Sequence, residues 1–303
     1  MNHPLFWILF NLFVVLMLVL DLGVFHRRAH AVRFREALAW SAMWVALAAG
    51  FAVLIYFWRG RTPTLEFVTG YLIEQSLSVD NLFVFLLIFR YFRVPPPQQH
   101  RVLFWGIIGA LIMRGVFILV GVSLIRRFEW IIYLFGAFLV FTGIKLFRQE
   151  EVEIHPEGNR LVRAVRRFVP VAGDFEGGKF FVQNNGLYAT PLLLVLLVVE
   201  TTDVLFAADS IPAILAITRD AFIVYTSNVF AILGLRSLYF ALAGMMERFH
   251  YLHYGLAVIL TFIGAKMLVS HFYPIPTEAA LAVVAIVLAL SVAASLLRPQ
   301  VNA

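Results

Sequence analysis

Long apolar runs follow one another along the chain, separated by short breaks that are charged or contain proline or glycine. Nine of these runs have the length of about 20 residues that a helix needs to cross the hydrocarbon core of a bilayer. They begin near Leu5, Ala37, Glu66, Val102, Trp130, Pro191, Ala221, Tyr251 and Glu278. The pattern predicts an all-α membrane protein of about nine transmembrane helices, forming a single polytopic domain over residues 1–303.

The composition excludes a soluble globular protein. The chain is 62% hydrophobic and 14% charged, whereas soluble proteins average roughly 45–50% apolar and about 25% charged residues. It contains no cysteine, which excludes disulfides and thiolate metal sites. We find no P-loop, GxSxG, HExxH or dinucleotide-binding glycine motif, so we expect neither an enzyme nor a resident cofactor.

The net charge of +6 indicates membrane topology rather than binding of nucleic acid. Most of the 24 Lys and Arg residues lie in the loops after odd-numbered helices and in the C-terminal tail. The positive-inside rule then predicts an N-terminus outside and a C-terminus in the cytoplasm. The polar stretch 148–190 falls on the cytoplasmic side. Its segment 160–168 is either an arginine-rich helix on anionic lipid or a basic loop, and a soluble partner could dock on this stretch.

The chain also repeats itself at a separation of about 121 to 123 residues. Asp80-Asn-Leu-Phe-Val aligns with Asp203-Val-Leu-Phe-Ala, Met113-Arg114 with Leu235-Arg236, and Gly143-Ile-Lys145 with Gly264-Ala-Lys266. We interpret 66–147 and 191–270 as two copies of a three-helix unit, followed by a ninth helix and tail over 271–303. On the predicted topology the copies have opposite orientations, the inverted-repeat plan of many secondary transporters.

Five carboxylates fall within the first helices of the two copies. An ionisable residue near the bilayer centre costs roughly 2.5–3.5 kcal/mol, so it normally faces a partner or a cavity. The carboxylates are Glu74, Asp80, Glu200, Asp203 and Asp209, and the deep cations available to balance them are Arg114 and Arg236. The excess of negative charge favours a bound cation or bound protons.

Helical spacing gathers some of these side chains on common faces. At 100° per residue, Glu74, Ser78 and Asn81 share one face of their helix. Glu200 and Asp203 share a face of the sixth helix, and Asp209 lies on the opposite side. Pro212 predicts a kink or an unwound turn beside Asp209, because proline cannot donate a backbone hydrogen bond.

The ligand chemistry favours a hard cation. All eight histidines fall in predicted loops or at helix ends, which leaves oxygen ligands suited to Mn²⁺, Mg²⁺ or Ca²⁺. The candidate metal ligands are Glu74, Asp80, Asn81, Glu200, Asp203 and Asp209, supported by Ser78, Ser210, Ser227, Asn228, Arg114 and Arg236. The alternative is structural: the carboxylates form ion pairs with the two arginines, and the polar side chains join helices by hydrogen bonds.

The acidic motifs resemble those of a known family. Glu74-Gln-Ser-Leu-Ser-Val-Asp80-Asn and Glu200-Thr-Thr-Asp203-Val-Leu-Phe-Ala-Ala-Asp209-Ser-Ile-Pro are similar to motifs of the TerC integral membrane family, and the length and nine-helix layout resemble its Alx branch. The resemblance implies a bacterial inner-membrane protein associated with Mn²⁺ export, and more loosely with tellurium resistance and alkaline stress. It also implies that the acidic positions of these motifs form the metal pathway.

Three functions follow as hypotheses. The first is a secondary transporter that exports a divalent cation, with Mn²⁺ favoured. The second is a tellurium-resistance component that binds an oxyanion through Arg114 and Arg236, which the negative excess opposes. The third is a membrane anchor that docks soluble partners through 148–190.

Overall fold

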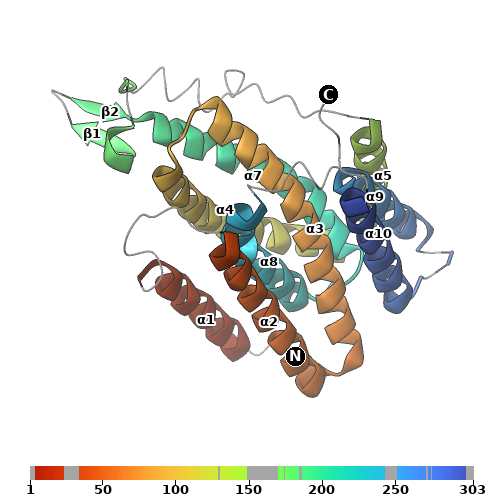
Figure 1. Cartoon of the computed structure of the whole chain (residues 1–303). Helices are drawn as coiled ribbons and strands as arrows, with labels where there is room; N and C mark the ends of the chain where they lie inside the picture. The colour runs from red at the N-terminus through yellow and green to blue at the C-terminus, as the bar shows by residue number, and fades with distance from the viewer. Residues whose placement is uncertain are drawn as a thin grey trace.

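The computed structural model describes residues 4–23, 34–128, 130–148, 170–173, 175–183, 186–242, 251–270, 272–273 and 275–297. Its long helices there are α1 (Pro4–Gly23), α2 (Phe34–Arg59), α3 (Arg61–Tyr91), α4 (Pro96–Arg127), α5 (Ile131–Arg148), α7 (Pro191–Leu215), α8 (Ala221–Leu242), α9 (Leu252–Val269) and α10 (Thr277–Leu297) (Figure 1). All except α1 are long and apolar enough to cross a membrane, and α1 has a shorter apolar stretch. The prediction of an all-α membrane protein of about nine helices is confirmed.

The helix ends follow the breaks in the apolar pattern. Gly60, with a φ of 88°, separates α2 from α3, a conformation that glycine adopts without steric cost. Prolines occupy the first turns of α4 and α7, where the missing N–H has no helical partner to lose. α3 and α4 begin several residues before the predicted positions, because their polar first turns are helical although they are not apolar.

The expected unwound turn beside Asp209 does not form. α7 continues as a helix through Asp209 and Pro212 to Leu215. Pro212 lies in the last turn, and its missing N–H removes the one hydrogen bond to the Ala208 carbonyl. The chain closes the turn normally behind it, since the Ala216 N–H donates to the Pro212 carbonyl at 3.0 Å.

A short antiparallel ribbon precedes α7. It consists of β1 (Phe181–Gln183) and β2 (Leu187–Ala189), with Val182 opposite Tyr188, and it follows a single 3-10 turn, η2 (Glu176–Gly178). Figure 1 shows the ribbon beyond the start of α7. The polar stretch therefore contains a β element that its amphipathic pattern did not predict, and the proposed interfacial segment 160–168 lies outside the described residues.

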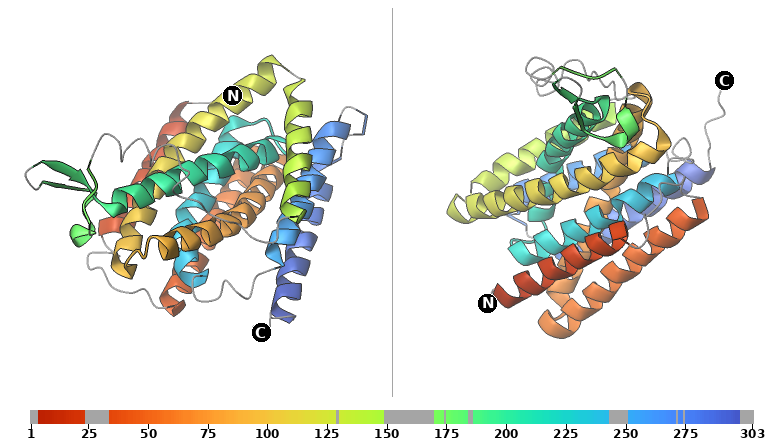
Figure 2. Two further views of the ribbon diagram at one scale, coloured as in Figure 1. Left: turned by 90° about the horizontal axis from the view of Figure 1, so that it is seen from above. Right: turned by 90° about the vertical axis from the view of Figure 1, so that its left-hand side faces the viewer.

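The polar interior lies between the helices of the two predicted repeats. α3 packs on α7 and α8, α4 packs on the same two helices, and α8 is the most buried of the membrane-crossing helices. α2 covers α8, while α10 packs on α3 and α9 (Figure 2). Polar residues of α3, α4, α7 and α8 consequently face one another away from lipid.

α5 and α9 pack against each other more extensively than any other two described helices, and glycines make their close approach possible. A Cβ on Gly136 would lie 3.0 Å from the Gly264 carbonyl oxygen, and one on Gly143 would lie 2.8 Å from the Ala257 carbonyl oxygen. In the repeat register Gly143 corresponds to Gly264, and Gly136 to Ala257. The two contacts are therefore equivalents of each other, as a two-fold relation requires. This supports the inverted repeat, which stays a prediction together with its boundaries.

Candidate functional site

A buried polar network lies where α3, α4, α7 and α8 meet. Glu74 is 0% exposed, Arg114 is 2% exposed and Asp203 is 3% exposed, so three charged side chains are removed from solvent. Such residues are stable in an apolar environment only when each charge has a partner. The sequence predicted that Glu74 and Asp203 approach each other from different helices, and the structure brings them to the same arginine.

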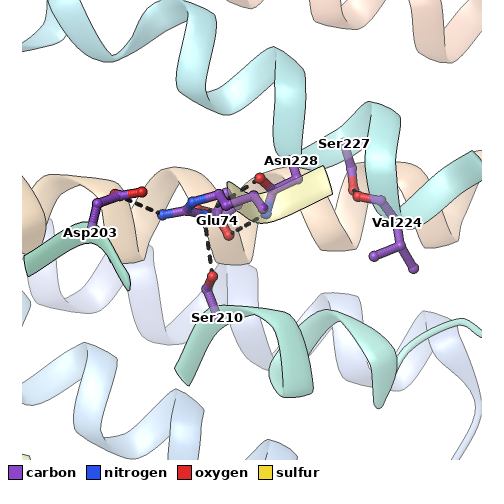
Figure 3. A network of polar contacts seen from close by, with 7 residues as sticks. Glu74, Asp203, Ser210, Val224, Ser227 and Asn228 are labelled. Atoms are coloured by element: carbon purple, nitrogen blue, oxygen red, sulfur yellow. Dashed lines mark hydrogen bonds and ion pairs between the residues drawn. The ribbon is translucent and has the colours of Figure 1, made fainter. Parts of the chain in front are cut away.

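Arg114 is the centre of this network. Its Nη1 forms an ion pair with Glu74 and donates to Ser210 Oγ at 3.2 Å, while Nη2 lies 3.4 Å from Asp203 Oδ1. The amide of Asn228 donates to Glu74 Oε2 at 2.9 Å, and its oxygen lies 3.5 Å from Arg114 Nη1 (Figure 3). The planar guanidinium suits this task because it presents several donors in a fixed fork.

The network keeps unused hydrogen-bonding capacity. Within the described part of the chain, Asp203 Oδ2 and Arg114 Nε are buried and have no hydrogen-bond partner. Two carboxylates share one guanidinium, so the formal charge of the trio is negative. A buried acceptor without a partner next to unbalanced negative charge is an environment that attracts a cation.

Glu200 adds a third carboxylate beside this trio. It lies one helical turn from Asp203 on α7, and the two carboxylates repel each other. Its side chain packs against α4 at Gly109, where an added Cβ would overlap the carboxylate itself. The glycine therefore makes the space that Glu200 occupies.

Asp209 points away from the network, as its position on the opposite face of α7 predicted. Thr142 of α5 donates to Asp209 Oδ1 at 3.2 Å, and Lys145 attracts the same carboxylate. The two acidic faces of α7 thus contact different helices. Asp209 does not share one ion site with Glu200 in this arrangement.

The other predicted site residues have separate surroundings. Ser78 and Asn81 are buried on α3, and Ser227 donates to the Val224 carbonyl at 3.1 Å. Arg236 is buried on α8, with Nη2 3.2 Å from His100 Nδ1. Asp80 belongs to α3, but its side chain lies outside the described part of the structure.

No group of three or more His, Asp or Glu side chains within metal-binding reach occurs among the described residues. Instead, Arg114 forms ion pairs with two of the predicted ligands, Glu74 and Asp203. The role of the candidate residues as metal ligands therefore stays a prediction.

Sequence reasoning missed a second charged cluster, near the start of α3. Thr218 donates to Glu66 Oε2 at 2.7 Å, and Arg59 pairs with Asp220 at 2.7 Å. Lys266 of α9 is 8% exposed and attracts Glu66. A signal was available, since Lys266 aligns with Lys145 in the repeat. Glu66, however, lies at the start of an apolar run, where a charged residue normally faces the membrane interface, so the sequence did not indicate it as a site residue.

Comparisons with known proteins place this architecture among membrane proteins. The model of the integral membrane protein TerC family matches residues 59–303. The chain is 54% identical over 300 residues to a membrane protein of Myxococcus xanthus, covering 99% of this chain and 94% of that protein. It is 50% identical over 291 residues to an Escherichia coli K12 protein named as a membrane-bound redox modulator, Alx, covering 93% and 91%. No solved structure matches.

Proposed function

Because the chain belongs to the TerC family of integral membrane proteins, we propose that this multi-pass membrane protein is a secondary transporter that exports a divalent metal cation, with Mn²⁺ as its substrate. One observation carries the proposal. Glu74 and Asp203, from the matching first helices of the two predicted repeats, meet in the interior with oxygen-bearing side chains around them. Carboxylates at the interface of inverted repeats are typical of ion-transport sites.

The charge of the site fits a divalent ion. When all three are ionised, Glu74, Asp203 and Glu200 supply three negative charges, and Arg114 supplies one positive charge. The formal sum is −2, which one divalent cation neutralises. Ser210 and Asn228 add a hydroxyl and an amide oxygen, and the set contains neither thiolate nor imidazole. Hard cations such as Mn²⁺ prefer this donor set.

Arg114 acts as a resident counter-ion in this proposal. When no substrate is present, its guanidinium bridges Glu74 and Asp203, so the carboxylates do not remain uncompensated inside the protein. An arriving cation competes with the guanidinium for the same oxygens. When the cation is released, Arg114 returns to the carboxylates of Glu74 and Asp203. The carboxylates are then compensated both with and without the cation, so the two states are comparable in free energy. Repeated transport cycles require this.

Surroundings and orientation are part of the proposal. We assign the protein to the bacterial inner membrane because its relatives are bacterial membrane proteins. The distribution of Lys and Arg favours an N-terminus outside and a C-terminus in the cytoplasm. The printed name of the Alx relative refers to redox modulation. This chain has no cysteine, so any redox effect would arise through the ion that it moves rather than through its own thiols.

The alternatives are weaker. An oxyanion would need a free guanidinium, whereas Arg114 already faces two carboxylates. An anchor that acts through 148–190 would not need buried carboxylates at all. Oxyanion binding predicts that Arg114→Gln abolishes tellurite tolerance while Asp203→Asn does not, and the anchor predicts loss of function only on deletion within that stretch.

Cellular manganese content tests the proposal. We expect wild-type protein to lower Mn²⁺ content and raise Mn²⁺ tolerance in a manganese-sensitive bacterial strain, and Asp203→Asn, Asp80→Asn and Asp209→Asn to lose this effect at equal membrane expression. Arg61→Gln, an exposed charge at the start of α3, serves as the control variant. Equal manganese content in cells with wild-type protein, with the variants and with no protein would refute the proposal.

A further inference from the structure

A groove opens beside α1, far from the acidic motifs. α1 lies at the edge of the bundle and packs mainly on α8 (Figure 1), where the ring centroids of Trp7 and Tyr225 are 5.3 Å apart. α4 does not close against α1. A cavity of about 490 Å³ remains between these two helices, and Tyr225 of α8 also lines it.

The groove contains one polar pair in an otherwise apolar lining. The Tyr225 hydroxyl donates to Asn11 Oδ1 at 2.7 Å, and Asn11 Nδ2 donates to the Trp7 carbonyl oxygen at 2.9 Å. An amide nitrogen carries two hydrogens, so one N–H of Asn11 remains. Among the described residues this N–H has no acceptor. Asn11 is exposed and lines the groove, so it offers a donor to a molecule that lies there.

The position of Asn11 in α1 makes an unused donor costly. Asn11 lies seven residues after Pro4, which is about 10 Å along the helix axis. At that depth a membrane-crossing helix meets hydrocarbon rather than water, and hydrocarbon supplies no hydrogen bond. Polar side chains in such helices normally face a partner. An acceptor that enters the groove would complete the hydrogen bonding of Asn11.

The lining changes in character along the groove. Near the start of α1 it consists of the rings of Trp7 and Tyr225 beside Asn11, and toward Leu18 it is aliphatic. α4 presents Gly115 to the Tyr225 ring, since an added Cβ would lie 3.7 Å from Cε2. No side chain at this position of α4 therefore covers the ring. The groove fits a flat head group with an acceptor, followed by a hydrocarbon tail of about 16 Å.

Charge restricts the ligand further. None of the described residues that line the groove is charged, so a phosphate head group finds no counter-ion there. The ester groups of membrane lipids also stay at the interface, above the depth of Asn11. A second groove, of about 800 Å³, lies between α1 and α2, and its described lining contains no amide or hydroxyl side chain. That groove suits ordinary acyl chains and serves as an internal comparison.

We propose that the groove between α1 and α4 binds a neutral isoprenoid quinone. A ring carbonyl accepts the remaining N–H of Asn11, the flat ring lies against Trp7 and Tyr225, and the tail follows the aliphatic part. An apolar cleft of this volume with a few placed polar groups is typical of small-molecule sites. The inference goes beyond the proposed function and does not depend on Mn²⁺ transport.

Photo-labelling of the full-length protein in phosphatidylcholine nanodiscs tests the site. An azido derivative of a short-chain ubiquinone is illuminated, and the labelled residues are identified by mass spectrometry. We expect labels on α1 near Asn11, on α4 near Gly115 and at Tyr225. Excess unmodified short-chain ubiquinone should reduce this labelling several-fold. Squalane, an isoprenoid hydrocarbon without an acceptor, should not reduce it.

Variants of the polar pair separate recognition from simple filling of the groove. Asn11→Leu keeps the volume and removes the donor, so labelling at the groove should fall about fivefold, the scale of one neutral hydrogen bond. Tyr225→Phe keeps the ring and removes the hydroxyl that holds the Asn11 amide, so labelling should fall in the same direction. Leu12→Ala is the matched control, because Leu12 is 63% exposed and lines neither groove.

Two results would overturn the proposal. Labels spread equally over both grooves of α1, and displaced by squalane as well as by ubiquinone, would show a surface filled by ordinary lipid. Equal labelling of wild type, Asn11→Leu and Tyr225→Phe would show that the polar pair does not recognise the ring. A Tm for each variant close to that of Leu12→Ala shows that a loss of labelling is not a loss of fold. Mn²⁺ flux enters neither measurement, so failure of the site and failure of the proposed function are distinguished.

Discussion

At the scale of single residues, the interior is organised by cations that belong to the protein. Arg114 compensates Glu74 and Asp203, and Arg59 pairs with Asp220 at 2.7 Å. The first group is buried, whereas the side chains of the second pair are 23% and 24% exposed. The stability of the protein should therefore depend more on Arg114 than on Arg59.

Arg114→Met should destabilise the protein strongly. It leaves Glu74 and Asp203 buried without their guanidinium, and breaking a buried pair from one side costs about 3–5 kcal/mol. Thermal unfolding of the purified protein in detergent measures the loss. Adding Glu74→Gln and Asp203→Asn to Arg114→Met should restore part of it, because no charge then remains unpaired. A triple variant less stable than Arg114→Met alone would show that the ion pairs are not the source of the loss.

Gly109→Ala should disturb Glu200 specifically. The new Cβ would overlap the Glu200 carboxylate, so the side chain must leave its place against α4. We expect reduced Mn²⁺ flux with nearly unchanged thermal stability, since Glu200 is half-buried and can move. Gly50→Ala on α2, where an added Cβ meets nothing within 4 Å, is the matched control. Full activity of Gly109→Ala would mean that the position of Glu200 is unimportant for transport.

At the scale of helices, the crossing of α5 and α9 depends on the absence of side chains. Gly136 and Gly264 face each other so closely that each added Cβ would press on the other's backbone. Small residues at such crossings are the usual means of helix association in membranes, where the hydrophobic effect gives little drive.

Gly264→Ala should therefore weaken this helix pair. Its Cβ would lie 2.6 Å from the Gly136 carbonyl oxygen and 2.8 Å from the Val140 nitrogen, so the helices must separate. The expected loss is about 1–3 kcal/mol of stability, as for other overpacked contacts, and it is read as a lower Tm. Gly50→Ala is again the control, and a Tm for Gly264→Ala equal to that of the control would exclude a tight crossing.

The sequence predicted helices better than contacts. Hydropathy located all nine described helices, and helical spacing correctly separated Asp209 from Glu200 on α7. Ion pairs of the carboxylates with Arg114 and Arg236 were the structural alternative, but the sequence could not predict that Arg114 would join Glu74 and Asp203 in particular, because the rotation of one helix against another depends on packing across the whole bundle. Thr218 and Glu66 meet across 152 positions for the same reason. The break expected at Pro212 does not occur, because the proline removes a single backbone hydrogen bond and the helix continues through it to Leu215.

At the scale of the whole molecule, the predicted inverted repeat requires α3 and α7 to enter the membrane from opposite sides. The reciprocal glycine contacts of α5 and α9 are what a two-fold axis in the membrane plane produces. The network at Arg114 draws carboxylates from both first helices, so a relative movement of the two units would change the distance between Glu74 and Asp203. Access to alternate sides of the membrane requires such a movement.

Sidedness can be tested because the chain has no cysteine, so a single introduced thiol reports its own location. Arg61→Cys lies at the start of α3, and Lys179→Cys lies shortly before α7; both positions are exposed. A membrane-impermeant maleimide added to intact spheroplasts should label Arg61→Cys, and it should reach Lys179→Cys only after permeabilisation. Labelling of both from the same side would eliminate the inverted repeat, since the first helices of the two units would then run in parallel. Labelling in the reverse order would keep the repeat and invert the orientation.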